Sequence, residues 1–185
     1  MTYSRENPSK KYKQLVDLYY EQHHLPKSYM GKSLEEHIPA INHLINTYNC
    51  KTGLDYGAGK GACQGGLKFL HIHSYDPGLK DKRELPDQPL DATICVDVME
   101  HIPQDDVDWV IEEIINLSKK FVFFSISCVP AVKIMPNGEN AHCTIHNPKW
   151  WLKKIKDIRN ASEHKPFVRC VFYCKEQEDI GEFGC

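Results

Sequence analysis

The sequence predicts an α/β fold built on a single doubly wound, mostly parallel sheet, and three observations carry this prediction. Continuous apolar runs, typical of strands covered on both faces, alternate with stretches of helical periodicity. The first of these strands ends in a glycine-rich turn, where open α/β sheets bind ligands. The length of 185 residues suits one domain and leaves little room for a second.

Two helices are expected before the first strand. Residues 9–24 carry apolar side chains at helical spacing, namely Tyr12, Leu15, Val16 and Tyr19. Pro26 and Gly31 interrupt that helix. Ser33 and Glu36 then have the spacing of a capping box, which predicts the start of a second helix.

The middle of the chain predicts two strands joined by a helix, followed by an unusually short connection. The strands cover residues 52–56 and 71–75, and residues 60–70 are expected to form the crossover helix. Only 14 residues then separate Asp76 from Asp91. A helix, a strand and another helix cannot all fit there, so the third strand is expected to be shortened or missing.

The following segment predicts the centre of the sheet. Residues 92–96 and 121–127 are buried strands, and residues 103–120 form the helix between them. Charged residues mark both ends of this helix, and we interpret them as solvated groups that suit the helix dipole: Asp105, Asp106 and Asp108 at the start, Lys119 and Lys120 at the end.

A long loop and a last helix and strand complete the chain. Residues 128–144 directly follow the carboxyl end of a strand, a position where loops commonly carry function, so we expect substrate specificity to reside there. Asn147 and Pro148 predict the start of a helix. Residues 167–175 form the last predicted strand, and the acidic tail from Glu176 is expected to be frayed.

Composition restricts the compartment and the partners. The net charge of −2 provides no basic field for a long nucleic-acid track, so nucleic acid is disfavoured as a partner. The eight cysteines lie mostly in apolar runs, without a Cys-x-x-Cys pair. No apolar run reaches the roughly 20 residues of a membrane span, and residues 1–8 are polar, as in a loose terminus. We therefore expect a reduced, cytoplasmic protein without a membrane span.

The glycine-rich turn predicts a ligand site. Gly57, Gly59 and Gly61 allow positive φ and a close approach of a ligand to the main chain. The N–H groups of the following helix are expected to point at that ligand. Because Gly57, Gly59 and Ala62 also fit the dinucleotide fingerprint, with Asp76 near the distance of a ribose-binding acid, an NAD-dependent enzyme stays open.

Asp55 favours a different ligand. Its carboxylate lies two residues before Gly57, where it would repel a pyrophosphate. The same carboxylate could pair with the ammonium group of S-adenosylmethionine (SAM). The sulfonium cofactor therefore fits the turn better than a dinucleotide.

Three segments together resemble the Rossmann-like (class I) SAM-dependent methyltransferases: Leu54–Gly61, Tyr75–Gly78 and Asp97–Pro103. The resemblance covers residues 51–128 in the right order and extends weakly to residue 175. The segments Gly31–Leu34 and Asn140–His142 also resemble a group of small methyltransferases from phages and marine bacteria. The resemblance implies a Rossmann-like fold with an antiparallel last strand, and an enzyme in the cytoplasm of its host.

The resemblance also implies a cofactor site for SAM and its product S-adenosylhomocysteine. Residues 1–50 would form a helical cap, with Tyr29 and Met30 at the cofactor, and residues 51–185 the core. Asp76 would accept hydrogen bonds from the ribose, and Leu85 with Pro86 would replace the adenine pocket of the missing strand. The implied cofactor-binding residues are Asp55, Gly57, Ala58, Gly59, Asp76, Pro77, Asp97, Val98 and Tyr29, with Glu100 and His101 close to the methionine part or the substrate.

The expected reaction is methyl transfer to an O or N atom of a small molecule, a sugar or a lipid-linked acceptor. The acceptor must lose a proton, and histidine titrates in the useful range, so His142 and His101 are the candidate bases. No metal is expected, because His71 and His73 share a strand face but lack a third ligand nearby.

Other functions stay open at this point. The chain could be a regulatory module that binds SAM or a nucleotide without transferring a methyl group. It could also methylate RNA or protein, although its size and charge favour a small acceptor. We expect a monomer or a homodimer.

Overall fold

Alternating side chains of the strands divide the interior into two apolar layers. The computed structural model describes residues 3–25, 30–175 and 178–184. Ile94 and Phe123 point into one layer, and their neighbours Cys95 and Phe124 point into the other. This period of two requires cover on both faces of the sheet, which explains why the central strands are apolar throughout.

The sheet has six strands in the order β2-β1-β3-β4-β5-β6. The first five are parallel to their neighbours, and β6 is antiparallel to β5. The predicted α/β class with a mostly parallel sheet and an antiparallel last strand is therefore confirmed. The strands are β1 (Thr52–Tyr56), β2 (His71–Tyr75), β3 (Leu90–Val96), β4 (Ser118–Ser127), β5 (Phe167–Tyr173) and β6 (Glu178–Phe183).

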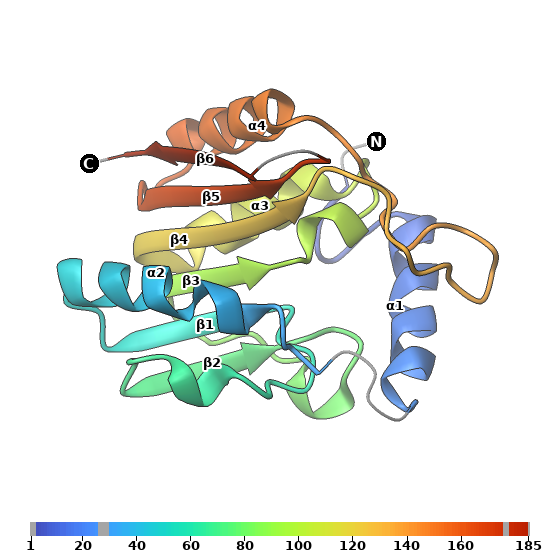
Figure 1. Cartoon of the computed structure of the whole chain (residues 1–185), viewed down its shortest axis with the longest axis horizontal. Coiled ribbons are helices and arrows are strands. Elements are labelled where there is room, and N and C mark those ends of the chain that lie inside the picture. Colours follow the sequence, from blue (N-terminus) through green and yellow to red (C-terminus); the bar gives the residue numbers. More distant parts are fainter. Residues whose placement is uncertain (1–2, 26–29, 176–177, 185) are drawn as a thin grey trace.

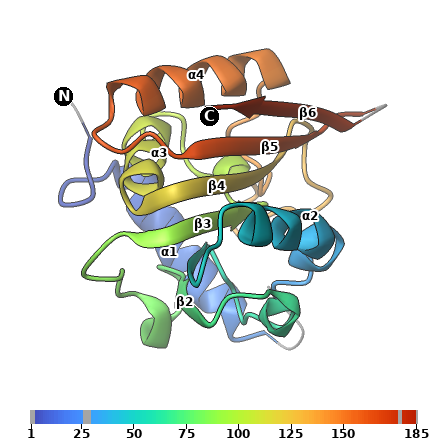
Figure 2. The same cartoon turned by 90° about the vertical axis from the view of Figure 1, so that its left-hand side faces the viewer.

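Helices lie on both faces of the sheet and across the carboxyl ends of its strands (Figures 1 and 2). One face carries α2, and the other carries α3 and α4. Figure 1 shows α1 across the carboxyl ends of the strands, away from both faces. The helices are α1 (Lys10–His23), α2 (Leu34–Thr47), α3 (Val107–Asn116) and α4 (Pro148–Ala161), with short 3-10 turns η1 (Gln64–Gly66), η2 (Lys80–Lys82) and η3 (Met99–His101).

The predicted crossover helix over residues 60–70 is wrong. This stretch, which is fully described, forms only the 3-10 turn η1. Several glycines make a helix costly there, and Gly66 lies so close to α2 that an added Cβ would be 2.5 Å from Ile38 Cδ1. Asn42 of α2 also bonds the backbone of this stretch, with 2.9 Å to Gly66 O and 2.9 Å from Lys68 N. Helix α2 thus covers the face that the crossover helix would have covered.

The short connection between β2 and β3 behaves as predicted. All residues between Asp76 and Asp91 are described, and before β3 begins at Leu90 they form the 3-10 turn η2 and no strand. The additional strand that would lie between β2 and β3 in the sequence is therefore missing, and β2 is the edge strand of the sheet.

The last two strands differ from the expectation. The strand predicted at residues 167–175 is β5, which runs parallel to β4, and the antiparallel strand is β6. Residues 178–183, expected to fray, pair along the whole of β5, from Tyr173 opposite Glu178 to Val168 opposite Phe183. The tail therefore closes the sheet on this side.

The helix predicted at residues 103–120 is shorter, since α3 begins at Val107 and β4 already begins at Ser118. Lys120 consequently belongs to a strand and pairs with Asp91 at 3.0 Å. Asp106 is not solvated but fully buried. Its Oδ1 accepts hydrogen bonds from Ser9 N and from Trp109 Nε1, both at 2.9 Å, and so fixes the start of α1 against α3.

Helix caps match the sequence in one case and not in the other. The side chain of Asn147 accepts a hydrogen bond from Trp150 N at 3.0 Å, which confirms the predicted start of α4. Ser33 precedes α2 but its side chain makes no capping hydrogen bond. Glu36, the other half of the expected capping box, instead accepts from Tyr173 OH at 2.9 Å.

No described helix is long and apolar enough to cross a membrane.

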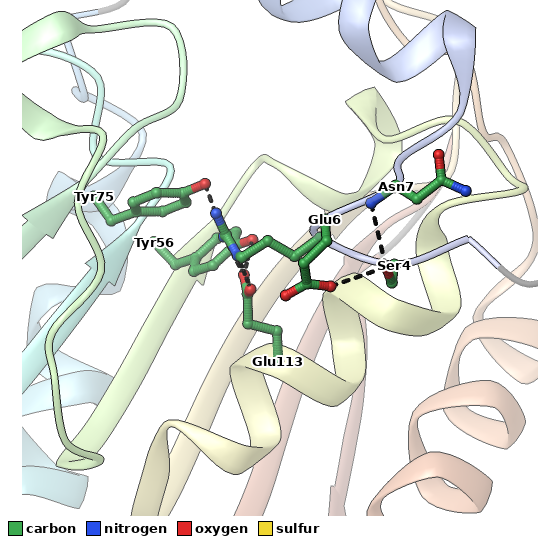
Figure 3. A network of polar contacts seen from close by, with 7 residues as sticks. Ser4, Glu6, Asn7, Tyr56, Tyr75 and Glu113 are labelled. Carbon is green, nitrogen blue, oxygen red and sulfur yellow. Dashed lines mark hydrogen bonds and ion pairs between the residues drawn. The ribbon is translucent and has the colours of Figure 1, made fainter.

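The N-terminal segment is held in place, contrary to the expected loose terminus (Figure 3). Arg5 forms an ion pair with Glu113 of α3, and its second nitrogen donates to Tyr75 OH at 2.9 Å. Tyr56 OH donates to Glu113 Oε1 at 2.7 Å. Glu113 and Arg5 therefore join the N-terminal segment to β1, which leads into the glycine-rich turn, and to β2 beside it.

We expect Glu113→Ala to lower the free energy of unfolding by about 1–3 kcal/mol, because it leaves the Arg5 guanidinium and the buried Tyr56 hydroxyl without their acceptor. Chemical denaturation measures this difference. Glu112→Ala, an exposed neighbour on the same helix, is the matched control and should change stability by less than about 0.5 kcal/mol. Equal effects of the two substitutions would contradict the assigned role of Glu113.

Candidate functional site

A cavity of about 710 Å³ opens at the carboxyl ends of β1, β2 and β3, under α1. Its volume lies within the range of small-molecule sites. Side chains from α1 and from the segment before α2 form one wall, and the ends of the strands form the other. The residues that line the cavity include Tyr12, Leu15, Val16, Tyr19, His23, Met30, Gly31, Lys32, Asp55, Gly57, Ala58, Gly59, Asp76, Pro77, Asp97, Val98 and His101.

The glycine-rich turn forms the floor of the cavity. Gly57 has φ of 80°, and a Cβ there would lie 2.2 Å from Val98 Cγ2, so only glycine allows the two strand ends to approach this closely. Gly57 N and Ala58 N both donate to Tyr75 O, at 2.8 and 3.0 Å. Because these N–H groups are bonded internally and no α-helix follows, the expected helix N-terminus behind the turn is absent.

Asp55 is buried at the end of β1 and lines the cavity. Its Oδ2 accepts a hydrogen bond from Gln64 Nε2 of η1. Burial raises the pKa of Asp55 to about 6, although the bond from Gln64 opposes this shift. A cation that enters the cavity would stabilise the ionised form of this carboxyl and lower its pKa.

Asp76 is fixed at the end of β2 by backbone groups. Gly59 N donates to its Oδ2 at 2.8 Å and Gly78 N donates to its Oδ1 at 2.9 Å. His23 of α1 lies on the other side, with Nε2 3.5 Å from Oδ1. Each carboxylate oxygen can accept a further hydrogen bond, so Asp76 is an oriented acceptor on the cavity wall.

Asp97 follows β3 in a left-handed conformation, with φ of 53°. Ser125 holds it from β4, since Ser125 Oγ donates to Asp97 Oδ1 at 2.7 Å and Asp97 N donates to Ser125 O at 3.0 Å. A residue with a Cβ adopts this conformation at a cost and only where its surroundings impose it. The strain aims the Asp97 carboxylate at the cavity.

Glu100 and His101 lie on η3, directly after Asp97. Glu100 is fully buried, and burial together with the charge of Asp97 raises the pKa of its carboxyl to about 8. Its Oε1 accepts from Ser127 N at 3.0 Å, whereas its Oε2 has no hydrogen-bond partner among the described residues. His101 reaches the cavity, and burial lowers the pKa of its imidazole to about 4, so the ring is uncharged.

The loop predicted to carry specificity does not line the cavity. None of residues 128–144, all of which are described, belongs to the cavity wall. His142, the first candidate base, instead packs edge-on against His101, with ring centroids 4.8 Å apart. It therefore contacts a residue of the cavity wall without lining the cavity itself. The loop also contacts α1, where Lys11 pairs with Glu139 at 3.4 Å.

The structure brings together eight of the nine residues expected at the cofactor, and the ninth, Tyr29, lies outside the described residues. Leu85 and Pro86 do not line the cavity, and Leu85 packs on the core instead. His23 and Lys32 are wall residues that sequence reasoning missed. For His23 a signal existed, because it continues the helical spacing of Tyr12, Val16 and Tyr19 along one face of α1.

The site is therefore a cavity with three carboxylates, an internally bonded glycine-rich turn and an apolar helix above them. These features come from the chain's own geometry and sequence. Comparisons with protein-family models, with curated proteins and with solved structures found no match for this chain.

Proposed function

We propose that this chain binds SAM in the cavity and transfers its methyl group to an O or N atom of a small acceptor. One observation carries the proposal: Asp55, Asp76 and Asp97 meet around the glycine-rich turn, at the carboxyl ends of three adjacent strands. The resemblance of the surrounding sequence segments to class I methyltransferases supports the same conclusion.

The charge of the cavity favours a cationic ligand over a dinucleotide. Among the described residues its charged lining consists of the three carboxylates and Lys32. A pyrophosphate usually binds at free backbone N–H groups of a helix N-terminus. Here the turn donates its N–H groups to Tyr75 O and to Asp76, and a 3-10 turn replaces the helix. Both differences favour SAM over NAD.

The cavity residues suggest how SAM would be held. Asp55 would pair with its ammonium group, and Asp76 would accept hydrogen bonds from the ribose hydroxyls. The apolar side chains of α1, Leu15 and Val16, would cover the bound molecule and exclude water. Because the connection between β2 and β3 contains no further strand, the adenine would pack against apolar side chains of α1 and against Pro77.

The bound cofactor would supply a methyl group on a sulfonium, which leaves to a nucleophile in line with the C–S bond. The protein must then align the acceptor and keep water out, and such effects contribute several kcal/mol. Of the two candidate bases, only His101 lines the cavity among the described residues, and it would accept the proton of the acceptor. His142 would position the His101 ring.

Isothermal titration calorimetry with SAM, S-adenosylhomocysteine and NAD tests the cofactor. We expect binding of the first two ligands and no response to NAD. A labelled-methyl assay against extracts, fractionated into lipid, saccharide, other small molecules, nucleic acid and protein, then tests transfer. We expect the label in one of the first three fractions. NAD binding without a SAM response would overturn the proposal, whereas SAM binding without transfer to any fraction would indicate a regulatory module.

Asp76→Asn should weaken SAM binding by about 10- to 100-fold, because loss of a charged acceptor for hydroxyl groups costs about 1.5–3 kcal/mol. Asp87→Asn, an exposed substitution in the same connection, is the control and should leave affinity unchanged. Circular dichroism verifies that both variants fold. Unchanged affinity in a folded Asp76→Asn variant would remove Asp76 from the site.

The affinity for SAM should fall as the pH drops through about 6. Asp55 has a raised pKa of about 6, so it is ionised above this pH and can pair with an ammonium, and it is neutral below. Calorimetry at pH 5 and pH 8 measures the difference, which approaches tenfold per pH unit at the acid end. In Asp55→Asn the affinity should be low at both pH values. A pH dependence that survives this substitution would contradict the pairing.

A further inference from the structure

The geometry points to a binding site for a divalent transition-metal ion formed by Glu100, His101 and His142. Each of these residues offers one ligand atom, and the three atoms lie within 4.8 Å of one another. Two imidazole nitrogens and one carboxylate oxygen form a common ligand set for ions such as Zn²⁺, with further positions open to water or substrate. This ion is distinct from the proposed organic cofactor.

Glu100 provides the first independent sign of a ligand. Its carboxylate is fully buried, and its Oε2 has no hydrogen-bond partner among the described residues. A buried polar atom without a partner costs free energy, so such atoms are rare in folded proteins unless something binds them. Ser127 N fixes the other oxygen, Oε1, at 3.0 Å and thereby orients the carboxylate.

The hydrogen bonds of both histidines leave a nitrogen available for a metal. His101 Nδ1 lies 2.8 Å from Ala141 O and 2.8 Å from the hydroxyl oxygen of Tyr19, which can accept as well as donate, and His142 Nδ1 lies 2.6 Å from Val129 O. A carbonyl oxygen can only accept, so the proton of each neutral ring belongs on Nδ1 and the lone pair on Nε2. Backbone carbonyls commonly orient metal-binding histidines in this way.

The loop that carries His142 is tied to the other two ligands. Cys143 N and Thr144 N both donate to Glu100 O, at 2.9 and 3.0 Å. Cys143 Sγ donates to His101 O at 3.2 Å. These bonds hold His142 beside η3 although the two segments are about 40 residues apart in the sequence. An ion at about 2.1 Å from each ligand would draw the three atoms closer together.

The position of the cluster gives the ion a role that rests on the proposed function. His101 and Asp97 line the cavity, so an open coordination position beside His101 can face the acceptor. A metal ion lowers the pKa of an oxygen that coordinates it. The acceptor would then be a small molecule whose reactive hydroxyl binds the ion. Its proton would pass to solvent, and His101 would serve as a ligand of the ion instead of as the base.

Metal binding can be measured without SAM. The full-length chain, freed of metal with a chelator, is titrated with Co²⁺ and its visible d–d absorption is recorded, followed by displacement with Zn²⁺. We expect one Co²⁺ per chain, displaced by Zn²⁺, and no displacement by equal amounts of Mg²⁺, which prefers oxygen ligands. No Co²⁺ absorption in the wild-type chain would overturn the inference.

Three variants assign the site. His142→Ala removes a half-buried ligand outside the cavity wall, and Glu100→Gln keeps the shape of a buried one. Both should lose stoichiometric Co²⁺ binding, with folding checked by circular dichroism. The double variant His71→Ala, His73→Ala removes the other histidine pair and should bind Co²⁺ as the wild type does. Binding that depends on His71 and His73, or that persists in folded His142→Ala, would refute the assignment.

The outcome is separable from that of the proposed function. Co²⁺ binding without a SAM response in calorimetry would leave the metal site standing and remove the methyltransferase. SAM binding without Co²⁺ binding would remove the metal site and leave the proposed methyltransferase standing. If both are present, chelator treatment should abolish methyl transfer and leave SAM affinity unchanged, whereas transfer that continues in the chelated protein would remove the metal from the reaction.

Discussion

The site depends on the parallel register of β1 with its two neighbours. Asp55 lies opposite Ser74 of β2 and Ile94 of β3, so all three strands end at the same level. After β1 the chain forms β2 on one side of β1 and then β3 on the other side. The direction in which strands are added therefore reverses between β1 and β3. Open sheets form a crevice at this point. The contact of Gly57 with Val98 closes its floor, and every acid of the cavity is placed by these strand ends.

Loss of the crossover helix changes the chemistry of the turn as well as its shape. In a helix-bearing turn, free N–H groups and the helix dipole favour an anion. Here the same N–H groups donate to Tyr75 O of β2 and to Asp76, and carboxylates outnumber cationic side chains on the described part of the wall. The cover that the helix would supply comes from α2, which packs on the sheet and lies close to Gly66 of η1. A similar glycine pattern can therefore serve ligands of opposite charge, depending on whether a helix follows it.

Local pattern predicted most of the strands and helices, and together with the resemblance it singled out eight residues that the structure brings together around the cavity. Strands β1, β2 and β3 and the cap of α4 follow from periodicity and from Asn147, because these signals depend on neighbouring residues. The direction of β5 could not be predicted, since it depends on pairing with β4 and β6 rather than on its own residues. The burial of Asp106 and the position of His142 likewise arise from contacts between distant segments. Sequence spacing contains no record of such contacts.

The short segment from Asp97 to His101 links the two halves of the cavity. Asp97 contributes to the cavity wall, and its strained conformation precedes the turn η3 that carries Glu100 and His101. Ser125 and Ser127, both on β4, hold the two ends of this segment through Asp97 and Glu100. A ligand that contacts Asp97 and an ion that binds Glu100 would therefore act on one rigid unit of five residues. Because β4 fixes that unit from behind, either ligand would find the other's site already formed, and the ordering would cost little additional conformational entropy.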